Sequence, residues 1–306
     1  MTAIASSTSA FYERSAMDIS SLRARAESLQ AQLSSGSKLT RSSDNPVAAS
    51  RLRSLSRGSQ LSTVDTSNAN RASADLKLAD TAMSSFAEFI IRAQELTTQA
   101  ANGTLTASQR AGIGTELLQI HGNLVSLANT KDAAGHALFG GETTGSAYTL
   151  DVSGNAIYSG TASVPDLSLG DGQSVKRSLT GPEFLNFSVA GNPTDLMAVI
   201  KGLGEALQGA VADPAGAARA GLDVLSQGLD AVTTGQTLIG ARLAWIELTT
   251  ERRTNLSELN AGEEAEIGST DIASAVTELQ QVMLVLEASQ ASFVRLASLS
   301  LFDLLR

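Results

Sequence analysis

The feature that most constrains this 306-residue chain is a run of small and apolar side chains that repeats alternately every three and four residues. Such spacing places side chains on one stripe of a helix that packs along its length. Seven consecutive steps join Ala69, Ala72, Leu76, Ala79, Met83, Phe86, Ile90 and Ala93. Pro46 suits a first helical turn and Asn102-Gly103 a helix end, so we predict one helix over residues 46–101, with a possible break near Gly58. At 1.5 Å per residue it is roughly 84 Å long.

The second half of the chain repeats this plan. After Asp213-Pro214 the same alternation predicts a long helix, which Gly262 to Gly268 would interrupt. Shorter helices are expected after Pro193 and after Thr106, where Thr106 and Gln109 form a capping box. We predict that one bundle core is formed by Leu76, Met83, Phe86, Ile90, Leu117, Ile120, Leu124, Leu225, Leu229, Val232, Ile239, Leu243 and Ile246.

The two ends of the chain carry shorter stripes with the same spacing, and the last helix can be capped by Ser269 or Asp271. Residues 1–60 hold eight Lys and Arg against four Asp and Glu, whereas residues 262–306 hold two against seven. Opposite charges favour pairing of the two ends. The predicted assembly seam consists of Ile19, Leu22, Ala26, Leu29, Leu33, Ile272, Ala275, Leu279, Val282, Leu286, Phe293 and Leu296.

An isolated end helix buries too few side chains to offset its ordering cost of about 1–2 kcal/mol per residue. We therefore expect roughly the first 40 and the last 40 residues to be mobile in the free monomer and to order only on assembly or on binding of a chaperone. Protection of both ends from protease in a dilute monomer would contradict this hypothesis.

The middle of the chain differs from both halves, because glycine and turn-forming residues accumulate between His136 and Pro193. Ser153-Gly154-Asn155 between short β-rich runs predicts a hairpin. The fold class is therefore mainly α: an elongated coiled-coil or helical bundle built from both chain ends, with a small β-rich inserted domain. The expected domains are an N-terminal inner helix region, two bundle halves around the β-rich outer insert, and a C-terminal inner helix, at residues 1–44, 45–135, 136–192, 193–261 and 262–306.

Nothing in the sequence organises catalytic chemistry. The chain has no cysteine, and neither of its histidines, His121 and His136, has ligand spacing around it. The cluster Glu263, Glu264 and Glu266 is more typical of a solvated acidic joint than of a carboxylate site. A net charge of -9 argues against nucleic acid as a partner. We expect no enzyme activity, no cofactor and no metal.

Neither a cleavable signal nor a membrane span is expected. Residues 1–16 lack the basic start and apolar run of a signal peptide, and the longest uninterrupted apolar stretch found, Val282 to Leu286, is too short to cross a bilayer. Export from the cell would need another route.

Several motifs resemble a known family. Leu33–Gly36 followed by Asp44–Ala49 is similar to the N-terminal signature of the flagellin superfamily, and Glu95-Leu96 with Gln99–Gly103 resembles its motif at the end of the long helix. Asn129–Asp132, Gly135 and Leu138–Gly141 are more like the hook-associated protein 3 family than filament flagellin, as are Ala288–Gln290 and Leu299–Asp303. The final Leu304-Leu305-Arg306 is nearer a flagellin ending. The resemblance covers roughly residues 1–141 and 193–306.

The resemblance implies a structural subunit of the bacterial flagellum that joins hook to filament. It also implies export unfolded through the flagellar type III apparatus, an extracellular location, and assembly by coiled-coil packing of the terminal helices. The implied partners are other copies of the chain in a ring, a neighbouring hook-associated protein, flagellin, and a cytoplasmic export chaperone on the C-terminal helix. Two alternatives remain open: a short filament flagellin, and a module that binds a surface glycan or other ligand through the β insert.

Overall fold

The computed structural model describes residues 2–303, and side chains for residues 10–295. The chain divides into two compact units. The first combines the two ends of the chain, up to Gln60 and from Asn255 onward, and the second is Leu61–Thr254. The boundaries predicted at residues 44 and 261 both fall inside the first unit.

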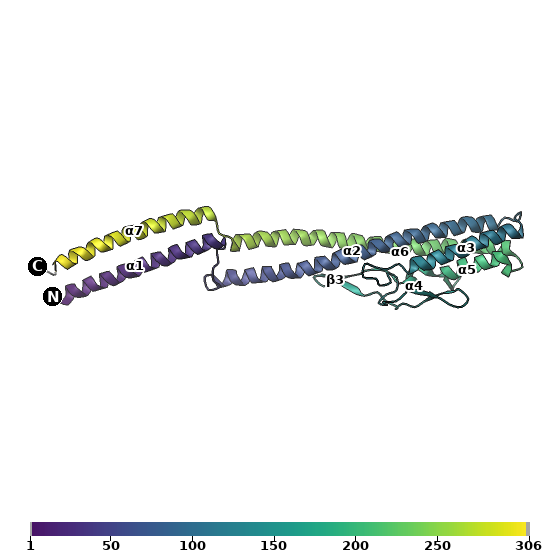
Figure 1. The fold of residues 1–306 in the computed structure, drawn as a ribbon, viewed down its shortest axis with the longest axis horizontal. Coiled ribbons are helices and arrows are strands. Elements are labelled where there is room, and N and C mark those ends of the chain that lie inside the picture. Colours follow the sequence, from purple (N-terminus) through teal and green to yellow (C-terminus); the bar gives the residue numbers. More distant parts are fainter. Residues whose placement is uncertain (1, 304–306) are drawn as a thin grey trace. The chain divides into compact units, whose positions relative to one another are not determined.

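Helices α1 (Thr2–Ser35) and α7 (Ile272–Asp303) run side by side in the first unit (Figure 1). Gly36 ends α1 with a φ of 68°, a backbone angle that suits glycine. An isolated β-bridge then joins Ser37 to Ser269, and Thr270 N donates to Gly36 O at 3.0 Å. Asp271 caps α7, because its Oδ1 accepts a hydrogen bond from Ala273 N at 3.0 Å.

Two helices of 55 residues each contribute to both units: α2 (Pro46–Ala100) and α6 (Pro214–Gly268). The predicted start of α2 at Pro46 is confirmed. The predicted interruption between Gly262 and Gly268 is wrong, since α6 remains helical to Gly268, and α2 does not break near Gly58. A glycine inside a helix costs about 1 kcal/mol relative to alanine, which a continuous helix of this length tolerates.

In the second unit, α2 and α6 pack with α3 (Ala107–Ala128) and α5 (Leu196–Glu205), which is followed by a π-helical turn, η1 (Ala206–Ala210). The predicted capping box of α3 is present: Gln109 N donates to Thr106 Oγ1 at 3.3 Å, and Thr106 N donates to Gln109 Oε1 at 2.9 Å. The 13 predicted bundle-core side chains lie in or against this core. Eleven are buried, and Leu229 and Leu243 are partly buried.

The β-rich segment forms three separate antiparallel hairpins rather than one sheet. The predicted hairpin around Gly154 is present, and Asp151 Oδ1 accepts from both Ser153 N and Asn155 N at 2.8 Å. A short helix, α4 (Gly181–Leu185), lies between the second and third hairpins. The strand pairs are β1 (Tyr148–Leu150) with β2 (Ala156–Tyr158), β3 (Asp166–Gly170) with β4 (Gln173–Lys176), and β5 (Asn186–Val189) with β6 (Asn192–Asp195).

The β-rich segment shares its core with the long helices. Phe184 of α4 packs at 5.3 Å from Phe86 of α2 and at 5.1 Å from Phe139, measured between ring centroids. All three rings are fully buried. The segment also reaches beyond the predicted end at residue 192, because β6 runs to Asp195. There the Asp195 carboxylate accepts from Ala198 N at 2.8 Å and caps α5.

Close packing of α3 on α5 generates a stability prediction. A Cβ on Gly114 would lie 2.6 Å from the backbone O of Gly204, whereas a Cβ on Gly112, two residues away in α3, would meet nothing within 4 Å. We expect Gly114→Ala to lower the free energy of unfolding by about 1–3 kcal/mol. The matched change Gly112→Ala should raise it by about 0.5–1 kcal/mol. Urea unfolding of both variants measures the difference, and equal effects would contradict the packing.

Candidate assembly interface

The pair formed by α1 and α7 buries one narrow seam. Ala26, Leu29 and Val282 are each 7% exposed, and Leu22 and Leu279 pack against them. Two helices in contact bury only the stripe between them. Most of their surface therefore remains open.

Two further contacts cross this seam. The rings of Tyr12 and Phe293 meet edge to face, with centroids 5.6 Å apart. Arg25 forms an ion pair with Glu278, and their side chains are 65% and 41% exposed. Exposed ion pairs contribute only about 0–1 kcal/mol, so the pair orients the helices more than it stabilises them. Sequence reasoning missed Tyr12, Arg25 and Glu278, although the opposite charges of the two ends signalled such pairing.

The predicted seam residues divide into three groups. Ala26, Leu29, Ala275, Val282 and Leu286 are buried, and Ile19, Leu22, Leu33, Leu279 and Phe293 are partly buried. Ile272, the first residue of α7, is 63% exposed, so its predicted place in the seam is wrong for the paired helices. Leu296 lies outside the described side chains.

Large apolar side chains of α7 also remain exposed outside the seam. Val276, Met283, Leu284, Val285 and Val294 each leave 39–69% of their surface open. Exposed apolar side chains in such number favour an interaction site over a solvated surface. The paired end helices can therefore pack on further helices.

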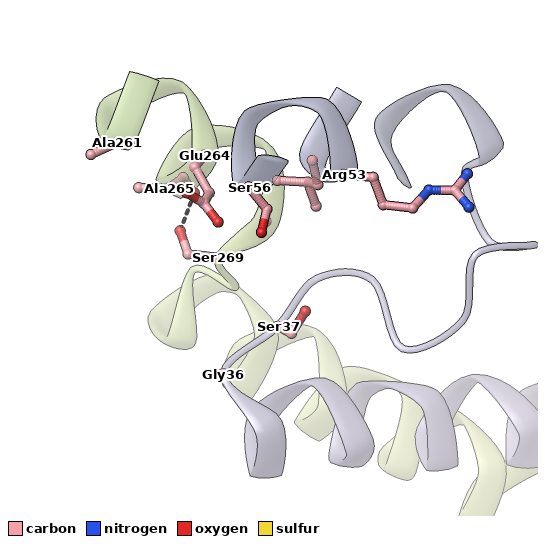
Figure 2. A pocket seen from close by; sticks show the side chains of 10 residues that line it. Gly36, Ser37, Arg53, Ser56, Ala261, Glu264, Ala265 and Ser269 are labelled. Carbon is pink, nitrogen blue, oxygen red and sulfur yellow. Dashed lines mark hydrogen bonds between the residues drawn. The ribbon is translucent and has the colours of Figure 1, made fainter. Parts of the chain in front are cut away.

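A groove of 610 Å³ lies in the first unit, near the ends of α1 and α6 (Figure 2). Leu52 is its largest apolar side chain, and the other lining residues include Gly36, Ser56, Ala265 and Gly268. In Figure 2 the guanidinium of Arg53 extends away from α6. The groove between α2 and α6 remains open because most of its lining side chains are small.

The three glutamates of the predicted acidic joint, Glu263, Glu264 and Glu266, lie in different environments. Glu263 forms a two-point ion pair with Arg51, at 2.5 Å from Arg51 Nε to Glu263 Oε1 and 2.6 Å from Nη2 to Oε2. The hydrogen bonds from Arg51 lower the pKa of Glu263. Glu264 and Glu266 are exposed.

A buried ion cluster in the second unit joins Asp75, Asp132 and Arg177. Asp132 accepts hydrogen bonds from Ala134 N and His136 N at 2.9 Å and from Arg177 Nη1 at 2.8 Å. Burial opposes ionisation of Asp132, but these donors outweigh it and lower its pKa. Burial raises the pKa of Asp75, whose Oδ2 lies 3.6 Å from Arg177 Nη1 and has no hydrogen-bond partner. Sequence reasoning missed Asp75 and Arg177, because nothing local links them.

The two histidines occupy different environments. His121 is buried, and burial followed by the charge of Lys201 lowers its pKa. His136 is partly exposed, with Nδ1 3.7 Å from Asp132 Oδ2. Within the described part of the chain, no group of three or more possible metal ligands comes together, and no helix is long and apolar enough to cross a membrane.

The model of the bacterial flagellin N-terminal helical region matches residues 7–144. The chain is 25% identical to flagellar hook-associated protein 3 of Escherichia coli over 97% of this chain and 98% of that protein. It is 33% identical to the protein of the same name from Salmonella typhimurium over 45% of this chain and 44% of that one. The fold also matches a putative flagellar hook-associated protein from Vibrio parahaemolyticus, with a TM-score of 0.67 and 23% identity, over 74% of this chain and 100% of that one.

The thin seam predicts unequal resistance to protease. Limited proteolysis of the dilute monomer should cut between residues 10 and 35 and between 272 and 295 first, because local unfolding there exposes little buried surface. A fragment close to Leu61–Thr254 should persist. Mass spectrometry of a time course identifies the cuts, and ends that outlast this fragment would contradict the expectation.

The ion cluster predicts a pH-dependent difference between two conservative variants. Asp132→Asn should cost about 2–3 kcal/mol of unfolding free energy at pH 7, because Arg177 loses its charged partner. Since the pKa of Asp132 is lowered, this contribution is present above the unfolded value of about 4 and disappears as the pH falls through the folded value.

Asp75→Asn is the matched control for this prediction. It should cost less than about 1 kcal/mol, because burial already disfavours the Asp75 carboxylate. Denaturation at pH 7 and pH 3 measures both variants. An Asp132→Asn defect that stays equally large at pH 3 would contradict the assignment.

Proposed function

We propose that the chain, as a member of the flagellar hook-associated protein 3 group of the flagellin superfamily, acts as the non-enzymatic subunit that joins hook to filament. Its mainly α fold, its structural role in the flagellum and its extracellular location agree with the predictions from sequence, which are confirmed. As a flagellar part, it associates with other flagellar components.

The observation that carries the proposal is the imbalance of the α1–α7 pair. Only a few side chains fill its seam, while α7 alone presents five large apolar side chains outward. Burying a large apolar side chain contributes about 1.5–3 kcal/mol. Packing these exposed residues against neighbouring subunits would add stabilisation that the seam alone does not supply, so order at the ends would depend on assembly.

This imbalance also supports a sequence of events. During export the ends would be loose, because the seam alone is weak, and they would close when copies of the chain meet in a ring. The partners that we propose are other copies, a neighbouring hook-associated protein, flagellin, and a cytoplasmic chaperone that covers the apolar face of α7 before export. The predicted seam and bundle-core residues are part of this proposal: the seam would form the inner wall and the bundle its outer support.

Deletion of the gene tests the proposed function. Loss of a junction subunit should leave hooks without filaments and release flagellin into the medium, because the filament then has no base on which to grow. Electron microscopy of cells and immunoblots of the medium measure both. Motile cells with normal filaments would refute the proposal.

Two other measurements distinguish the alternatives. A short filament flagellin would polymerise extensively on seeding, whereas a junction subunit would stop at a short ring. A ligand-binding role of the β-rich segment is tested with Leu150→Ser, Val152→Ser and Ile157→Ser, since these side chains of the first hairpin are at least half exposed. Deleting the whole segment would not serve, because Phe184 belongs to the shared core.

A further inference from the structure

In the second unit, the face of α6 that points away from the core changes from polar to apolar side chains. Positions spaced three or four apart on this face are first polar and exposed: Asp223, Gln227, Asp230 and Thr234. The next four positions of the same stripe are apolar and still exposed: Leu238, Ala241, Trp245 and Leu248. We call these last four residues the outer stripe. It ends at Arg252.

The outer stripe faces away from the core. Ile239 and Ile246 of the same helix are buried, at 0% and 5% exposure, whereas Leu238, Trp245 and Leu248 are 44%, 42% and 58% exposed. A helix that served only the bundle would continue its polar face, as it does up to Thr234. Trp245 is the only tryptophan of the chain. Tryptophan is the residue type most often found at the energetic centre of an interface.

An acidic pair lies on the side of α6 that faces α2, and Glu251 follows Leu248 of the outer stripe by three residues. Glu247 and Glu251 are exposed, and both line a groove of 680 Å³ between α2 and α6 in the second unit. Lys77 lines the same groove. Within the described side chains, neither glutamate forms an ion pair. Their spacing of four residues places both on one side of the helix.

The chain carries a basic pair with the same spacing. Arg53 and Arg57 of α2 are exposed, and neither forms an ion pair within the described side chains. Arg53 extends away from α6 of its own chain (Figure 2). Residues 36–60 hold five basic residues and one acidic residue.

We propose that a second copy of this chain docks on the outer stripe, with its Arg53 and Arg57 facing Glu247 and Glu251. This proposal rests on the proposed function, in which copies form a ring. The contact joins two different patches, so it is heterologous, and such contacts close into rings when the rotation per subunit allows. The apolar stripe supplies burial, and the matched charges fix the register of one helix on the next.

Crosslinking in assembled flagella tests the contact. The chain has no cysteine, so Arg57→Cys with Glu251→Cys introduces the only thiols. A short bifunctional maleimide should link these positions between copies and give a ladder of multiples of the chain mass. The control pairs Arg57→Cys with Asp223→Cys, at the polar start of the same face, and should give no ladder.

Charge reversal provides the second measurement. Glu247→Lys with Glu251→Lys should lower the amount of chain built into flagella roughly tenfold, because like charges then face each other. Adding Arg53→Glu and Arg57→Glu to the same chain should restore it. The same reversal at Asp223 and Asp230 should have no such effect.

The outcomes separate the two proposals. Wild-type chain that is absent from the hook–filament boundary refutes the proposed function. Wild-type chain at that boundary, with no ladder from Arg57→Cys and Glu251→Cys, overturns only the docking contact. A link from either cysteine to a protein of another mass also overturns it, since the occupant is then not a second copy.

Discussion

A pair of helices can bury only the stripe along which the two helices touch, and this constraint governs the whole chain. Where α1 and α7 are alone together, the buried seam is reduced to a few side chains around Leu29 and Val282. Where α2 and α6 gain further layers, fully buried phenylalanines appear. The number of layers therefore sets how much apolar surface each part removes from water, and with it the local stability.

In the second unit, the β-rich segment packs onto the helices and so increases the apolar surface that is buried. Phe184 and Leu179 of that segment fill the same core as Met83 and Phe86 of α2. Three short hairpins would be marginal by themselves, since an isolated two-stranded hairpin is barely stable in water. The segment and the helices thus depend on each other, and the segment is part of the bundle rather than a detachable module.

In the first unit, a single chain buries only the seam between its two end helices. The exposed apolar side chains of α7, and in the second unit the outer stripe of α6, are not covered by the chain itself. A subunit whose core is stable by itself, and whose exposed apolar side chains are covered only by neighbours, can remain a monomer until it meets other subunits. These properties fit a protein that is transported before it is assembled.

The sequence by itself determined the local features. Spacings of three and four residues located the helices, and Thr106 with Gln109, Pro46 and Asp271 marked their ends. These signals need only neighbours within about one helical turn. The sequence could not show that Gly262 remains helical, that Ile272 stays exposed, or that Asp75 and Asp132 share Arg177. Only the tertiary structure decided these points, because each depends on which distant segments lie together, and a periodic pattern carries no information about its partner.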